Sequence, residues 1–258
     1  MKYLRNVDPQ IYAAVVSELK RQQDNLELIA SENFTSLAVL EAQGSVFTNK
    51  YAEGYPNARW YGGCTNVDEV EILAIERAKK LFKAEHVNVQ AHSGTQANMA
   101  VYFSALKFGD KVLAMDLACG GHLTHGHPHN FSGMFYNVIT YGVDKKTELL
   151  DYDKIMDLAK RHKPKMILAG ASAYPRRIDF KHFRKICDKV GAYLFVDMAH
   201  IAGLVEQGCI PRQFRMRNLS VPLRIKLYEG PAADLSSVEK SLPKKLMRVS
   251  FPVSRAAL

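Results

Sequence analysis

Short apolar runs alternate with amphipathic stretches through the middle of the chain. Apolar runs predict strands at 87–92, 111–116, 165–172 and 192–200, and helical periodicity marks 94–108, 152–163 and 180–191. Continuous apolar strands are typical of a parallel sheet buried on both faces, with helices as crossovers. The pattern therefore predicts an α/β fold with a mostly parallel sheet and helices on both faces. Before this region, a helix over 8–29 that Asp8 can cap and a second helix over 67–84 are predicted.

Residues 211–258, called the tail below, break this pattern. They hold five of the ten prolines and keep neither helical nor strand periodicity. They also carry most of the net charge of +9, with 10 Lys and Arg against 3 Asp and Glu, whereas residues 1–210 hold 25 against 23. A nucleic-acid binder acting through this basic tail is one hypothesis, although the tail has only three aromatic residues and no binding motif.

Composition and cysteine placement set the broad class. With 47% hydrophobic and 24% charged residues, the chain is not disordered, collagen-like or a coiled coil. The four cysteines show no CxxC spacing, the first ten residues lack an apolar core, and no apolar run approaches the roughly 20 residues that cross a bilayer. We therefore expect a cytoplasmic protein with reduced thiols and no membrane segment.

Polar residues at two predicted strand ends are candidates for a ligand site, because ligands of parallel sheets bind at the carboxyl ends of the strands. SGTQANMA (93–100) begins a helix, where backbone N–H groups bind phosphate, although a structural glycine turn is the alternative. Asp197 follows a buried strand, with His200 three residues later. A buried carboxylate needs a partner such as a protonated heterocycle nitrogen, unless it merely caps the strand end.

Two loops add further candidates. CGGHLTHGHPHN (119–130) contains four of the nine histidines. Metal binding is one interpretation, but structural zinc sites normally recruit ligands from two segments, and the glycines before His122 favour a close ligand and a stacking ring. YAEGYPNARWYGGC (51–64) displays aromatic side chains and one acid, Glu53, which favours binding over plain core packing.

These segments together resemble the serine hydroxymethyltransferases, a family of pyridoxal-phosphate enzymes with an aspartate-aminotransferase-like fold. The resembling segments are LIASENF, TNKYAEGYPNARWYGGC, NVQAHSGTQANMAVY, GGHLTHG, AGASAYPR and AYLFVDMAHIAGLV, in the family's order over residues 5–210. The resemblance implies pyridoxal 5'-phosphate as cofactor, a homodimer or higher oligomer, and reversible transfer of the serine hydroxymethyl carbon to tetrahydrofolate. Glycine and 5,10-methylenetetrahydrofolate would be the products.

The resemblance also implies residue roles. For the cofactor, Gly94 and Thr95 would hold the phosphate, Tyr51 would reach the phosphate of the neighbouring subunit, His122 would stack on the pyridine ring, Asp197 would pair with its nitrogen, and Ser172 and His200 would contact the ring oxygen and its surroundings. For the substrates, Ser31 would hold the serine carboxylate, Glu53 would transfer a proton, Tyr61 would position serine, and Leu117, Gly121, His122 and Leu123 would line the folate site.

The lysine that forms the aldimine with the cofactor is missing from its motif. The family places it in a T-T-T-H-K-T segment, and the corresponding index here is Lys226, within VPLRIKLYEG. The index matches and the motif does not.

A slip of the reading frame near Pro211 accounts for this mismatch. Codons permitted for VPLRIKLYEGPAADL, regrouped so that each takes the last base of one codon and the first two of the next, translate to T-T-T-H-K-T-L-R-G-P-R-G-G-L. We therefore expect an N-terminal helical arm over 1–50, a partial large cofactor-binding domain over 51–210, and an irregular out-of-frame tail over 211–258, with the family's C-terminal small domain missing. A catalytically inactive fragment is the alternative function that follows.

Overall fold

The computed structural model describes residues 1–28, 32–209, 223–226 and 234–236. The chain divides into two compact units, residues 1–34 and 35–258. The domain boundaries predicted at residues 50 and 210 stay predictions.

The first unit contains α1 (Lys2–Val7) and α2 (Pro9–Asp24). As predicted, Asp8 caps α2, because its Oδ1 accepts a hydrogen bond of 3.0 Å from the Ile11 N–H. The helix predicted over 8–29 was extended too far. It ends at Asp24, where the Asn25 backbone turns extended and its side chain donates to the Arg21 carbonyl at 2.7 Å.

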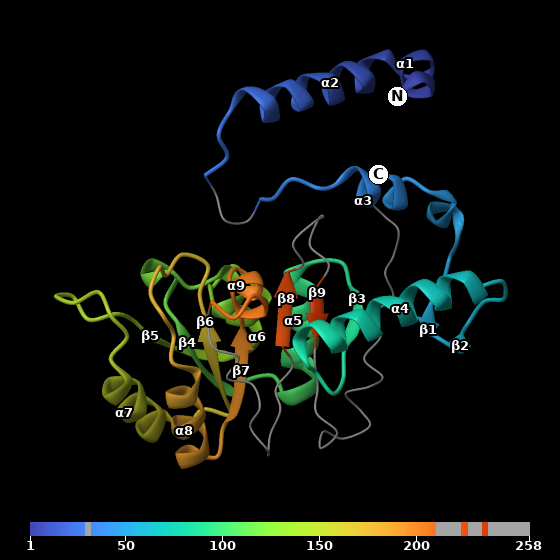
Figure 1. Cartoon of the computed structure of the whole chain (residues 1–258). Helices are drawn as coiled ribbons and strands as arrows, with labels where there is room; N and C mark the ends of the chain where they lie inside the picture. The colour runs from blue at the N-terminus through green and yellow to red at the C-terminus, as the bar shows by residue number, and fades with distance from the viewer. Residues whose placement is uncertain (29–31, 210–222, 227–233, 237–258) are drawn as a thin grey trace. The chain divides into compact units, whose positions relative to one another are not determined.

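The second unit contains the remaining elements, which Figure 1 labels. In chain order they are α3 (Leu37–Gln43), η1 (Val46–Asn49), β1 (Gly54–Tyr55), β2 (Ala58–Arg59), α4 (Thr65–Phe82), β3 (Asn88–Ala91), α5 (Gly94–Ala105), β4 (Lys111–Met115), η2 (Leu117–Cys119), η3 (Leu123–His125), α6 (Phe131–Phe135), β5 (Asn137–Tyr141), α7 (Tyr152–His162), β6 (Met166–Gly170), α8 (Phe180–Val190), β7 (Tyr193–Asp197), α9 (Ala202–Glu206), β8 (Leu223–Lys226) and β9 (Asp234–Ser236).

A seven-stranded sheet forms the centre of this unit. Its strand order is β3-β9-β8-β7-β6-β4-β5. The pairs β5–β4, β4–β6, β6–β7 and β7–β8 are parallel, and β9 is antiparallel to both β8 and β3. The prediction of a mostly parallel sheet is therefore confirmed.

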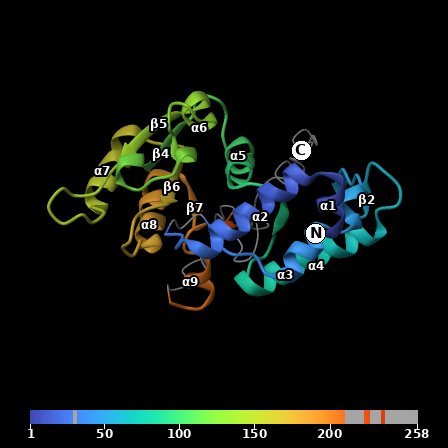
Figure 2. The ribbon, with the colours of Figure 1, turned by 90° about the horizontal axis from the view of Figure 1, so that it is seen from above.

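Both faces of the sheet are covered, and the strands alternate between two cores. On β4, Leu113 and Met115 pack into a cluster with α7 and α8, whereas Val112 and Ala114 pack into a cluster with α5 and α6. The helices α7 and α8 pack against each other on one face (Figure 2), and α5 contacts β3, β8 and β9. Burial on both sides explains why these strands are continuously apolar in the sequence.

Two parts of the sheet were not predicted. The strand β5 (Asn137–Tyr141) escaped the sequence pattern because only its last residue is buried. In the tail, expected to be irregular, the described residues form β8 and β9; the rest of the tail lies outside the described residues. Within the described part of the chain, no helix combines the length and apolar character needed to cross a membrane.

Candidate functional site

The turn between β3 and α5 directly follows β3, which is the first strand of the seven-stranded sheet in chain order. The Ser93 hydroxyl caps α5 by accepting a 3.2 Å hydrogen bond from the Gln96 N–H, and Gly94 is buried at the first helical position. The first-turn N–H groups of a helix have no partner within the helix, so this end of α5 suits an anion such as a phosphate group.

Asp197 ends β7, and its buried carboxylate accepts hydrogen bonds from three directions. The Asn98 Nδ2 lies 3.2 Å from Oδ2, the His125 Nε2 lies 3.1 Å from the same oxygen, and the Ala199 N–H donates to Oδ1 at 3.2 Å. Asn98 lies one helical turn after Gly94 on α5. The turn between β3 and α5, called the phosphate-type turn below, and Asp197 therefore belong to one connected site.

In the histidine loop (119–130), His122 is linked to this carboxylate network through Thr124. The His122 Nδ1 accepts from the Thr124 N–H at 3.2 Å and lies 2.8 Å from the Thr124 Oγ1. His125 is buried, whereas His129 is exposed. In the part of the chain that the structure describes, no three His, Cys, Asp or Glu side chains gather as metal ligands.

The backbone at the start of the histidine loop passes close to its neighbours. Gly120 has a φ of 105°, and a Cβ on Gly121 would collide with the carbonyl oxygens of Met115 and Asp116. The Gly120 carbonyl accepts a 2.8 Å hydrogen bond from the Ser172 N–H. The Ser172 hydroxyl is buried and, among the described residues, has no hydrogen-bond partner, so it is available to a ligand.

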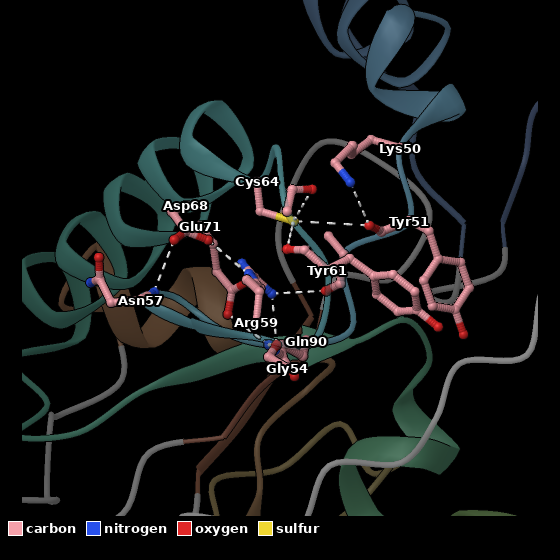
Figure 3. Close-up of polar contacts among 12 residues, drawn as sticks. Lys50, Tyr51, Gly54, Asn57, Arg59, Tyr61, Cys64, Asp68, Glu71 and Gln90 are labelled. Carbon is pink, nitrogen blue, oxygen red and sulfur yellow. Dashed lines mark hydrogen bonds and ion pairs between the residues drawn. The ribbon is translucent and has the colours of Figure 1, made fainter.

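The aromatic loop over 51–64 is held in place by Arg59, as Figure 3 shows. The guanidinium donates to Asp68 and Glu71 of α4, at 2.7 Å each, and its NH1 donates to the Ala52 and Gly54 carbonyls at 2.9 and 2.6 Å. Burial would lower the Arg59 pKa, but the two carboxylates outweigh it, so the pKa is raised. We call this group of contacts the Arg59 clamp.

The clamp is connected to β3, the strand before the phosphate-type turn. The Gln90 side chain donates at 2.8 Å to the Gly54 carbonyl and at 2.8 Å to Glu71 (Figure 3). On the same loop, the Tyr51 and Tyr61 rings meet edge to face with centroids 5.0 Å apart, and they are 40% and 51% exposed. The clamp thus fixes a loop that presents two tyrosines and Glu53.

Acid is expected to loosen the Arg59 clamp through Asp68. The Asn57 N–H, and after it Arg59, hold the Asp68 pKa below the ordinary value of an aspartate. A lowered folded-state pKa contributes stability at neutral pH that is lost as the pH falls below the unfolded value. In denaturant unfolding, the free energy of unfolding should therefore fall as the pH drops below about 4, and this fall should be smaller in Asp68→Asn than in the wild-type chain. The exposed Asp157→Asn on α7 is the control, and an unchanged pH dependence in Asp68→Asn would contradict the assignment.

The structure brings together only some of the predicted site residues. Asp197, His122 and Gly94 are joined through Asn98 and Thr124. Thr95 follows Gly94 in α5, and His200 is half-buried three residues after Asp197. Leu117 and Leu123 are 45% and 48% exposed. Ser31 and the side chain of Lys226 lie outside the described residues.

Three contributors were not assigned a role from sequence. Asn98 stands in the SGTQAN segment and His125 in the histidine loop, but nothing in the sequence shows that both contact Asp197. Arg59 was also missed. Its signal was the spacing of Asp68 and Glu71, which three residues apart share one face of a helix.

Comparison with protein families places this site in context. The family model described as Serine hydroxymethyltransferase matches residues 4–247. The match therefore covers nearly the whole chain, including every site residue named above and much of the tail.

Proposed function

The chain belongs to the serine hydroxymethyltransferase family, and from this premise we propose that its site binds pyridoxal 5'-phosphate and serves hydroxymethyl transfer from serine to tetrahydrofolate. Glycine and 5,10-methylenetetrahydrofolate are the proposed products. The family is one of pyridoxal-phosphate-dependent transferases, and the sheet with helices on both faces agrees with that fold.

The described residues fit this cofactor. The buried carboxylate of Asp197 is the observation that carries the proposal, because a charged acceptor at the carboxyl end of a parallel strand suits a protonated ring nitrogen. The buried Ser172 hydroxyl suits the ring oxygen, and Gly94 and Thr95 at the start of α5 suit the phosphate. Bound there, the cofactor supplies an electron sink for a carbanion on the substrate.

The remaining residues have proposed tasks around that site. His122, oriented by Thr124, stacks on the ring, and His200 contacts the surroundings of the ring oxygen. Glu53 holds and moves a proton, and Tyr61 positions serine. The Arg59 clamp supports both assignments, because it fixes the loop on which these two residues lie.

The assigned substrate contacts complete the proposal. Ser31 holds the serine carboxylate, and Leu117, Gly121, His122 and Leu123 line the folate site. The exposure of Leu117 and Leu123 supports a second substrate at this side of the site. A homodimer is part of the proposal, and the exposure of Tyr51 supports its reach towards the phosphate of a neighbouring subunit.

Replacing Asp197 is expected to weaken cofactor binding. In Asp197→Asn, the neutral amide cannot form a charge-assisted hydrogen bond to the ring nitrogen, so the Kd of the full chain for pyridoxal 5'-phosphate should rise about tenfold or more. An absorbance titration measures this change, with the exposed Asp153→Asn of α7 as control. Equal affinities of the wild-type chain and Asp197→Asn would contradict the role of Asp197.

The second candidate function is a noncatalytic chain that binds cofactor without turnover. The observation in its favour is that VPLRIKLYEG around Lys226 lacks the family's lysine motif. The frameshift near Pro211 is part of this proposal, while the family match extends beyond that point to residue 247. Nucleic-acid binding rests on the tail, whose side chains lie outside the described residues, and stays a prediction.

A further inference from the structure

The hydrogen bonds around His125 define which ring nitrogen carries the proton. The His122 N–H donates to the His125 Nδ1 at 3.1 Å, so Nδ1 is an acceptor. A neutral ring that accepts at Nδ1 has its hydrogen on Nε2. This Nε2 lies 3.1 Å from the Asp197 Oδ2, and both side chains are buried. His125 therefore donates to Asp197.

The Asn98 amide has an equally defined orientation. Its Nδ2 lies 2.6 Å from the Thr124 Oγ1 and 3.2 Å from the Asp197 Oδ2, so both amide hydrogens are used. A flipped amide would place its oxygen against the carboxylate, with two acceptors facing each other. Since the Thr124 hydroxyl accepts from Asn98, it can donate to the His122 Nδ1, which lies 2.8 Å away.

We propose that His125 is a positioning residue that holds Asp197 for the cofactor's ring nitrogen and ties it to the stacking ring of His122. Hydrogen bonds donated to a carboxylate favour its charged form, and the donor on Oδ2 fixes its rotation. The second nitrogen of the same imidazole holds the backbone of His122. Asp197 and His122, on which binding of the cofactor ring depends, are thereby both held by hydrogen bonds to His125. This inference rests on the proposed function, because Asp197 and His122 have those tasks only there.

Nitrogen NMR of the full chain tests the contact without cofactor. In a ¹⁵N-histidine-labelled sample, His125 should show an unprotonated Nδ1 and a protonated Nε2 whose hydrogen exchanges slowly with water. That exchange should become fast in Asp197→Ala, while the exposed His129 is unchanged. A hydrogen on the His125 Nδ1, or an exchange rate that does not respond to Asp197→Ala, would overturn the proposal.

Cofactor titration of two substitutions separates positioning from mere packing. His125→Gln can still donate to Asp197, whereas His125→Leu fills space without a donor. The Kd for pyridoxal 5'-phosphate should rise about tenfold or more in His125→Leu and stay within about threefold in His125→Gln and in the control His129→Ala. An equal rise of the Kd in His125→Gln and His125→Leu, with unchanged circular dichroism spectra, would overturn the proposal. A wild-type chain that takes up no cofactor would contradict the proposed function instead, and the NMR result would still decide the role of His125.

Discussion

Under the frameshift hypothesis, restoring one base near codon 211, so that the frame also continues through the missing small domain, is expected to turn a chain without serine-dependent turnover into an active hydroxymethyltransferase. The chemistry of the family needs a lysine that reacts with the cofactor, and the regrouped codons recover that lysine within T-T-T-H-K-T. Under this hypothesis, the lysine codon of the original frame straddles the codons of Ile225 and Lys226. The expected gain runs from no detectable rate to the ordinary enzyme range of roughly 1–10³ per second.

The comparison uses both chains under the same conditions. Glycine formation from serine and tetrahydrofolate is measured, and a restored chain that also carries Asp197→Ala serves as the matched inactive control. Resequencing the gene across codons 208–216 tests the frame itself. Turnover by the present chain at the restored rate, or cofactor fixed to Lys226 by borohydride, would contradict the expected inactivity of the present chain.

Arg59→Met is expected to lower the free energy of unfolding by about 3 kcal/mol or more. The Arg59 side chain is 5% exposed, while Asp68 and Glu71 are 15% and 13% exposed. Removing the cation leaves two nearly buried carboxylates without their charge partner, which costs about 3–5 kcal/mol in buried pairs. The change also removes the donors to the Ala52 and Gly54 carbonyls.

Two variants give this measurement its controls. Arg59→Lys keeps the charge but lacks the planar guanidinium fork that donates to both carboxylates. Its free energy of unfolding should therefore fall between those of wild type and Arg59→Met. The exposed Arg77→Met on α4 should change the free energy of unfolding by less than about 0.5 kcal/mol. A loss below about 1 kcal/mol in Arg59→Met would show that the clamp contributes little, and equal losses in the Lys and Met variants would show that the fork and not the charge matters.

The sheet was predictable where local sequence alone decides the structure. Strands β4, β6 and β7 are apolar at nearly every position because the two cores use alternate residues of each strand. The strand β5 was missed because only Tyr141 is buried and the other positions are half-buried or exposed, so its pattern is weak. The end of α2 was missed because apolar residues continue beyond Asn25, whose side chain nevertheless caps the helix.

The candidate site was predictable only in part. Sequence indicated Asp197 and the start of α5, because both follow apolar strands. It could not indicate the donors to Asp197, because Asn98 and His125 lie 99 and 72 residues away along the chain. Such contacts depend on the packing of α5 and η3 against the end of β7, which no local pattern records.

The strand order also affects the timing of folding during synthesis. The strand β3 leads into the start of α5, yet its only strand partner among the described residues is β9 (Asp234–Ser236), which follows all the central strands in the sequence. Strands β4 to β7 can pair as soon as they leave the ribosome, but β3 must wait for β9. A nascent chain arrested before residue 234 would hold the central strands without the edge that supports the phosphate-type turn. The ligand site is therefore expected to form after the central strands have paired, because such long-range pairing is slow.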